Sequence, residues 1–176
     1  MKTHQSTENH FKHKGVDIGR GRYDEEMVYG VGLVYISMIN VIGAYLKDHD
    51  LSPTDMNVLM LVKHQGERQG ISQVDLGQKL MVTAHNMTRA LQRLEKKGLL
   101  KRVIYKKDAR VNLVTITAKG SALLDQVWPG YEERLQGLAN NISGEEQKVL
   151  AGLLQKWLTR QAEGTLHGTH MPDTVI

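Results

Sequence analysis

The first long run of apolar residues predicts a helix near the start of the chain. From about Tyr23 to Asp48, apolar side chains recur every three or four residues, which is the spacing of one face of an α-helix. The stripe comprises Val28, Val31, Tyr35, Met38, Ile42 and Leu46. The twenty residues Met27–Leu46 carry no charge, which is also the length of a membrane span. Because polar and glycine residues interrupt this stretch, we interpret it as a helix buried within a protein.

Capping residues predict where the next two helices begin. Ser52 precedes a proline and predicts a helix that continues until Gly66. Ser72 is followed by Asp75 three residues later, a pattern that favours the start of a helix. This second helix is short and ends near Met81.

A two-faced helix is predicted from Ala84 to Lys97, where Gly98 ends it. It follows a short break at residues 82–83, and two short helices joined in this way are typical of a helix-turn-helix. The apolar face comprises Met87, Leu91 and Leu94. The polar side chains are His85, Asn86, Thr88, Arg89, Gln92 and Arg93. Such side chains can bond base edges or phosphates in a major groove, although a plain solvent-exposed face has the same pattern.

A β-hairpin is predicted directly after this helix. The runs Leu100–Tyr105 and Val111–Ile116 are rich in β-branched residues, and the connection at 106–110 is basic. Between Arg89 and Arg110 there are nine Lys or Arg residues and two acidic residues. Such a cluster indicates a phosphate-binding surface, or else a solvated charged face. A helix-turn-helix followed by a basic hairpin is typical of a winged DNA-binding module, which we therefore predict.

Helices on both sides of this module complete a mainly α (α+β) fold. One begins after Thr117, and the Pro129-Gly130 pair should kink or break it. Ser143 and Glu146 start the last helix. The predicted organisation is a flexible arm (1–22), an N-terminal dimerisation helix (23–50), a winged helix-turn-helix with a two-stranded wing (51–117), C-terminal dimerisation helices (118–162) and a flexible tail (163–176).

The composition narrows the classes of function. The chain has no Cys, which excludes disulfides, thiolate metal sites and cysteine nucleophiles. The net charge is +4 and the isoelectric point is near 9.2. The first 22 residues lack the apolar segment of a secretory signal, so we expect a cytoplasmic protein without a membrane partner. No nucleophile motif or converging set of acid–base residues is evident, so we predict neither enzymatic activity nor a cofactor.

Three motifs resemble those of one protein family. Residues Thr88–Arg102 resemble the recognition helix and the start of the wing in regulators of the MarR family. Asp108–Arg110 resembles the tip of their wing, and Thr115–Gly120 resembles the strand that leads into their next helix. The resemblance extends from about Tyr23 to Gln161, which is most of the chain.

The resemblance implies a homodimer that binds double-stranded DNA at a palindromic operator, most commonly as a repressor. The first helix and the last two helices of each protomer would interlock. Base contacts would come from His85, Asn86 and Arg89. Arg110 would enter the minor groove, oriented by Asp108. Phosphate contacts would come from Ser72, Thr83, Thr88, Arg93, Lys106 and Lys107.

The resemblance also implies a small-molecule effector. Many MarR proteins lose DNA affinity when an anionic, often phenolic, ligand enters a cleft between the dimerisation helices and the winged module. By analogy, the candidate ligand contacts are Tyr35, Met38, Met60 and His64. A role in the hydrophobic core is the alternative for each of them. The redox-sensing members of the family need Cys, so that branch is excluded here.

The main alternative function is a metal-binding protein or a metal-responsive regulator. His10 and His13 lie near the start, and His167 and His170 near the end, each pair three residues apart. Both pairs lie in polar, Gly-containing segments without a neighbouring carboxylate cluster, so we assign no metal site. A winged helix that serves only as a protein scaffold is a further alternative, but it has no need of the basic helix and wing.

Overall fold

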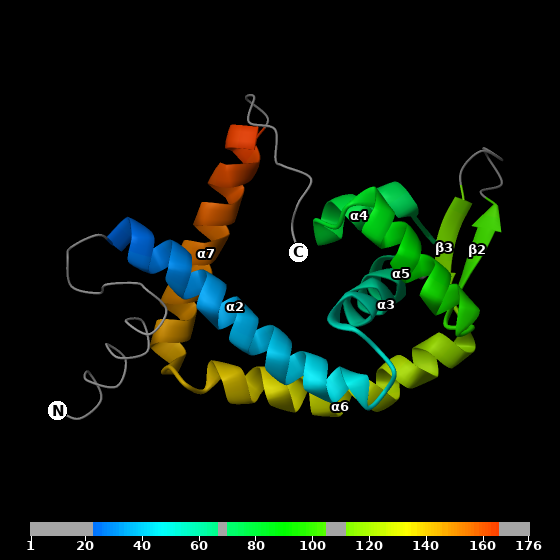
Figure 1. The fold of residues 1–176 in the computed structure, drawn as a ribbon, viewed down its shortest axis with the longest axis horizontal. Coiled ribbons are helices and arrows are strands. Elements are labelled where there is room, and N and C mark those ends of the chain that lie inside the picture. The colour runs from blue at the N-terminus through cyan, green and yellow to red at the C-terminus, as the bar shows by residue number, and fades with distance from the viewer. Residues whose placement is uncertain (1–22, 67–69, 105–111, 166–176) are drawn as a thin grey trace. The chain divides into compact units, whose positions relative to one another are not determined.

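The computed structural model describes residues 23–66, 70–104 and 112–165. Its contacts divide the chain into two compact units, Met1–Ala44 and Tyr45–Ile176. Figure 1 labels the elements, whose order confirms the mainly α fold with a small sheet. They are α2 (Tyr23–Lys47), α3 (Pro53–Gly66), β1 (Ile71–Ser72), α4 (Gln73–Leu80), α5 (Ala84–Lys96), β2 (Leu100–Ile104), β3 (Asn112–Ile116), α6 (Ala118–Ala139) and α7 (Gly144–Thr165).

Most of α2 lies in the first unit, and its apolar side chains are largely exposed. More than half of the surface of Tyr29, Val34 and Tyr35 is accessible. Within the described ranges, α2 alone is long and apolar enough to cross a membrane, which is weak evidence because core helices of soluble proteins meet the same criteria. Only 6% of its most apolar window is buried. The buried position predicted from the sequence is therefore not found in the single chain.

The second unit has a hydrophobic core between α3, α4, α5 and the sheet. The inward face predicted for the helix at 84–97 is confirmed, and α3 and α4 also contribute fully buried side chains. The fully buried side chains include Met56 and Leu59 of α3, Leu76 of α4, and Met87, Leu91 and Leu94 of α5. Lys97 is the C-terminal capping residue of α5, and Gly98 follows with a φ of +70°. This left-handed conformation explains why the helix ends there.

The sheet has three antiparallel strands in the order β1-β3-β2, one more than the predicted two-stranded wing. Strands β2 and β3 pair along their full length and lie side by side in Figure 1. The additional strand β1 pairs Ile71 with Val114. Gly70 precedes it with a φ of +84°, and a Cβ at this position would lie 2.9 Å from the Cβ of Leu113. Glycine therefore allows β1 to approach β3 closely.

The sequence predicted a kink or a break at Pro129, and the break is not found, because α6 continues through this residue as a single helix. A proline inside a helix removes one backbone donor and introduces a steric clash. Tyr45 packs against this part of α6: its hydroxyl donates to the Val127 carbonyl over 2.9 Å, and its ring lies 4.0 Å from the guanidinium carbon of Arg134. These contacts on both sides of Pro129 support the uninterrupted helix.

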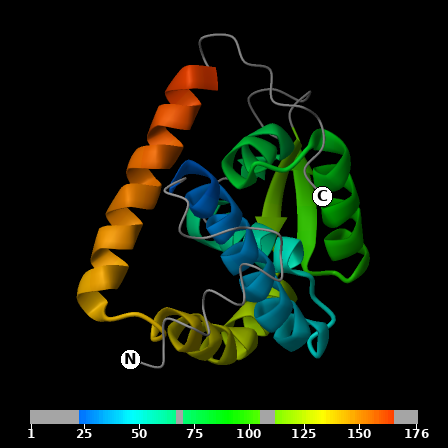
Figure 2. The same cartoon turned by 60° about the vertical axis from the view of Figure 1, so that its left-hand side comes forward.

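Helix α7 begins where the sequence predicted it, after a capping box. The Ser143 amide and hydroxyl both donate to the Glu146 carboxylate over 2.7 Å. The helix ends at Thr165 and so includes residues 163–165, which the sequence assigned to the tail. Glu163 favours helix, which explains this extension. In both views α7 follows the end of α6 and lies apart from the sheet and from α4 and α5 (Figures 1 and 2).

Candidate nucleic-acid interface

The turn between α4 and α5 has the geometry of a helix-turn-helix without a glycine. Met81 caps α4 in the left-handed region, with a φ of +51°. This region is uncommon for residues other than glycine. Thr83 then caps α5, where its hydroxyl accepts the amide of Asn86 over 3.3 Å. The predicted break between the two helices is confirmed, and Met81 occupies the position where glycine is often found.

Helix α5 presents a polar face to solvent. His85, Asn86 and Arg89, the three predicted base-contacting residues, are all exposed. Gln92 is exposed on the same side of the helix, one turn beyond Arg89. The opposite face is buried in the core, so the exposed face alone is free to meet a ligand. Its amide, imidazole and guanidinium groups are those that bond base edges and phosphates in a major groove.

The hydroxyls of Ser72 and Thr88, both predicted phosphate contacts, are hydrogen-bonded within the protein. Ser72 accepts the Asp75 amide over 3.1 Å and donates to the Asp75 carboxylate over 2.7 Å. Thr88 accepts from the Gln73 side chain and donates to the Ala84 carbonyl, both over 2.8 Å. Because a hydroxyl has a single proton, donation to a phosphate would require either residue to exchange a bond that stabilises α4 or α5.

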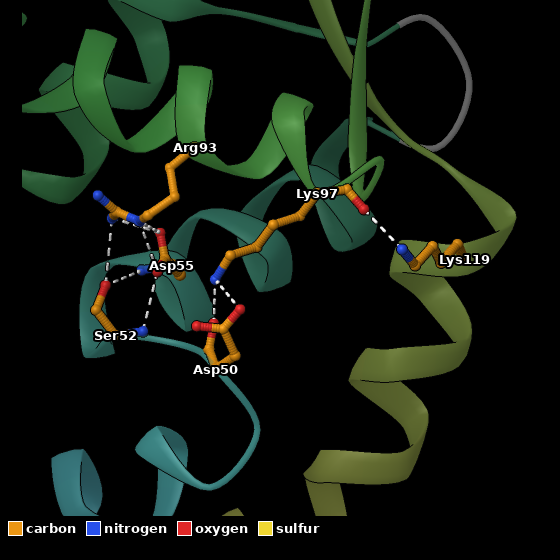
Figure 3. Close-up of polar contacts among 6 residues, drawn as sticks. All are labelled: Asp50, Ser52, Asp55, Arg93, Lys97 and Lys119. Carbon is orange, nitrogen blue, oxygen red and sulfur yellow. Dashed lines mark hydrogen bonds and ion pairs between the residues drawn. The ribbon is translucent and has the colours of Figure 1, made fainter.

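Arg93, another predicted phosphate contact, lies beside a buried carboxylate (Figure 3). Its Nη2 donates to Asp55 Oδ1 over 2.6 Å and its Nε donates to Asp55 Oδ2 over 3.1 Å. The side chain of Asp55 is 1% exposed and that of Arg93 is 43% exposed. The hydrogen bond to Asp55 raises the pKa of Arg93, and this effect exceeds the opposing effect of burial.

The same carboxylate caps α3. Asp55 Oδ2 accepts the Ser52 amide over 2.9 Å, and Ser52 Oγ accepts the Asp55 amide over 3.1 Å. Arg93 Nη2 also lies 3.4 Å from Ser52 Oγ. The sequence indicated the start of α3 at Ser52 but not the link from Asp55 to α5, because 38 residues separate Asp55 from Arg93. A charge at the edge of an otherwise apolar helix face was the only signal for it.

Two further contacts attach the C-terminal end of α5 (Figure 3). Lys97 forms an ion pair with Asp50 over 2.9 Å and also donates to the Asp50 carbonyl. Lys119 of α6 donates to the Lys97 carbonyl over 2.8 Å. On the neighbouring strand, Arg102 pairs with Glu95 of α5 over 2.8 Å. The helix with the exposed polar face is therefore attached to α3, α6 and the sheet.

Several predicted residues lie outside the described part of the chain. They are the wing-tip residues Lys106, Lys107, Asp108 and Arg110, and the histidines His10, His13, His167 and His170. Within the described ranges, no group of three or more His, Cys, Asp or Glu side chains is placed to hold a metal ion.

The four candidate ligand contacts lie on two elements. Tyr35 and Met38 are exposed on α2, in the first unit. Met60 and His64 lie on α3, in the second unit; Met60 is half-buried and His64 is exposed. The assignment of these four residues to one ligand site therefore remains a prediction.

Comparison with known proteins identifies the family. The family model described as MarR family matches residues 49–110. The HTH-type transcriptional regulator MhqR of Bacillus subtilis is 30% identical over 122 residues, which cover 69% of this chain and 82% of the relative. The chain belongs to the MarR family. The regulator YkoM of the same organism is 33% identical over 110 residues, covering 62% of this chain and 70% of that protein.

Solved structures of MarR-family proteins share the fold, and some contain DNA. A cysteine-to-serine mutant of MarR from E. coli, complexed with operator DNA, has a TM-score of 0.68 at 27% identity and covers 78% of this chain and 98% of its own. The MepR–DNA complex of S. aureus has a TM-score of 0.68 at 25% identity and covers 76% and 96%. This MarR-family chain is therefore a DNA-binding transcription regulator with a winged helix.

Proposed function

We propose that this MarR-family regulator binds a palindromic operator as a homodimer in the cytoplasm and represses transcription until a small ligand releases it. The observation that carries the proposal is the exposed polar face of α5. His85, Asn86 and Arg89 are exposed on this face, and we assign the base contacts to them. Similarity to MarR and MepR, which were solved with DNA, supports this orientation of the helix.

Exposed apolar helices support the homodimer. On α7, Val149, Leu150, Leu153 and Leu158 are all exposed, and α2 has the same character. Large apolar patches on soluble proteins mark interaction surfaces. A second copy of the chain would cover them, and a two-fold dimer presents two α5 helices to the two halves of a palindrome.

Phosphate contacts would set the register of the protein on DNA, while base contacts would set the sequence. We assign the phosphate contacts to Ser72, Thr83, Thr88, Lys106 and Lys107. Arg110 would enter the minor groove, where the potential is most negative, and Asp108 would orient it. For Arg93 we propose a different role, described below, because its Nε and Nη2 donate to the buried Asp55 carboxylate.

The effector would be a small anionic or phenolic molecule, with Tyr35, Met38, Met60 and His64 as candidate contacts. Once an operator is known, small molecules can be screened for release of the protein from it. Alanine variants of Tyr35 and His64 should then bind DNA normally but respond more weakly to the active compound. A response unchanged in both variants would remove these residues from the assignment.

Selection of bound fragments from a random DNA pool, at near-physiological salt, tests the proposed function. An enriched palindrome with half-sites about one helical turn apart would support a dimer on adjacent major grooves. A salt titration on the winning duplex then measures the number of phosphate contacts. Binding that enriches no sequence and only weakens with salt would overturn sequence-specific regulation.

A further inference from the structure

The charged group of Arg93, a residue of α5, is bound by a buried carboxylate of the protein. Its guanidinium makes two well-formed hydrogen bonds to the buried Asp55 carboxylate, at 2.6 and 3.1 Å. It lies one turn beyond Arg89 and two turns beyond His85 along the helix. The exposed polar face and this bound guanidinium therefore belong to one rigid element.

The two hydrogen bonds restrain the orientation of the Arg93 guanidinium as well as its distance from the Asp55 carboxylate. A guanidinium that meets a carboxylate through two nitrogens is restrained in its plane, unlike an ammonium, which acts as a point charge. Asp55 cannot turn away, because it caps α3 through the Ser52 amide and is 1% exposed. The next residue, Met56, is fully buried in the core. Arg93 is therefore anchored to the most firmly packed end of α3.

A buried carboxylate is costly without its partner, so the bound arrangement is strongly favoured over one in which Arg93 leaves for a phosphate. Rotation of α5 about its axis would pull the guanidinium out of the plane of the Asp55 carboxylate. The same rotation would turn His85 and Arg89 away from the direction that they now face.

We propose that Arg93 is a positioning residue for DNA recognition: its paired hydrogen bonds to Asp55 fix the rotation of α5 against α3 and thereby aim His85 and Arg89. This inference rests on the proposed sequence-specific binding. It replaces the phosphate contact that the sequence predicted for Arg93. The two roles make opposite predictions when Asp55 is changed.

The test compares Asp55→Asn, Arg93→Lys and Arg93→Gln with the wild-type protein by fluorescence anisotropy. The probes are a duplex selected by the wild type from a random pool and a scrambled duplex of equal length. Lys96→Gln is the matched control, because it removes one positive charge from an exposed position on the same helix. Circular dichroism and thermal unfolding identify the temperature range in which each variant is folded.

As a positioning residue, Arg93 should affect specific binding alone. Asp55→Asn and Arg93→Lys should each weaken binding to the selected duplex about tenfold, within the range of coupling between contacting residues. Binding to the scrambled duplex should stay the same, and so should the slope of log affinity against log salt. In the double variant Asp55→Asn/Arg93→Gln the loss should be no larger than in Arg93→Gln alone, after the charge effect seen in Lys96→Gln is subtracted.

As a phosphate contact, Arg93 would behave differently. Asp55→Asn would free the guanidinium and leave binding unchanged or tighter, and Arg93→Lys would resemble the wild type. Arg93→Gln would then lower the salt slope by about 0.9 per lost contact and weaken both duplexes equally. Any of these results would overturn the proposal. If Asp55→Asn does not fold, Arg93→Lys decides alone, since it keeps the charge. Failure of the wild type to select a sequence would instead count against the proposed function.

Discussion

Leucine side chains are buried in the core of the winged module but exposed on helix α7. Leu91 of α5 is 0% exposed, whereas Leu153 of α7 is 58% exposed. Burying a leucine side chain contributes roughly 1.5–3 kcal/mol to stability. The module obtains this contribution within one chain, whereas Leu153 of α7 leaves most of its surface accessible in the single chain. Apolar spacing therefore predicts that a helix forms and which face is apolar, without saying what covers that face.

The largest expected effect comes from shortening a leucine in each region. Leu91→Ala removes buried atoms and leaves a cavity, so it should lower the free energy of unfolding by about 2–5 kcal/mol. Leu153→Ala should have an effect that depends on protein concentration, because the loss would fall on the proposed homodimer interface. Urea unfolding at two protein concentrations measures both.

The two helices would not differ in this way if both variants lost stability equally. A concentration-independent loss of the same size for Leu153→Ala would mean that α7 is covered within its own chain. A negligible loss for Leu91→Ala would mean that the core around α5 is loosely packed.

The next largest effect is expected on the formation of dimers. Leu153→Glu places a charge on the exposed apolar face of α7 and should convert dimers into monomers on size-exclusion chromatography with light scattering. Operator affinity should fall about 100-fold or more, because joining two binding modules raises affinity by that order. Gln155→Glu is the control, since it adds the same charge at an exposed polar position of the same helix. Dimers that persist in Leu153→Glu would place the interface elsewhere.

A smaller effect is expected from the wing tip, which belongs to neither region. Arg110→Ala should weaken operator binding several-fold by removing a minor-groove contact. The thermal midpoint and the oligomeric state should not change, because neither the core nor the apolar helices are altered. Fluorescence anisotropy with the selected duplex measures the operator affinity. Thermal unfolding of the same samples measures the stability. An unchanged affinity would contradict the assignment of the wing tip to DNA.

Local signals explain what the sequence predicted well. The start of α3 after Ser52 and the end of α5 before Gly98 both depend on residues within a few positions of the helix end. Strand β2 begins at Leu100 and β3 ends at Ile116 as predicted, because a run of β-branched residues is its own signal. The exposed side of α5 followed from the spacing of its buried leucines.

Contacts between distant residues explain what the sequence missed. Strand β1 has two residues, which are too few to show the alternating pattern of a strand. It forms because Gly70 allows it to pair with β3. The Asp55–Arg93 pair joins residues that are separate in the sequence, so a side chain predicted to bind phosphate instead lies against a buried carboxylate. Pro129 was expected to disrupt α6, and the packing of Tyr45 on that helix could not be seen from local pattern.

The smallest effect concerns the first turn of α7 and its response to pH. Hydrogen bonds from the Ser143 hydroxyl and amide lower the pKa of Glu146 below its usual value. A depressed carboxylate pKa contributes stability above the pKa of the unfolded chain, near 4.5, and this contribution is lost as the pH falls through the lower pKa of the folded state. The protection of the Ser143 amide against hydrogen exchange, relative to its intrinsic rate at each pH, should therefore fall below about pH 4.5 in the wild type. In Glu146→Gln, which keeps a carbonyl acceptor but does not titrate, this loss of protection should be absent. Because the turn lies outside the core of the winged module, the unfolding of that core should be the same in both proteins over this pH range. An equal response of Ser143 in both proteins would show that the capping box does not control this end of α7.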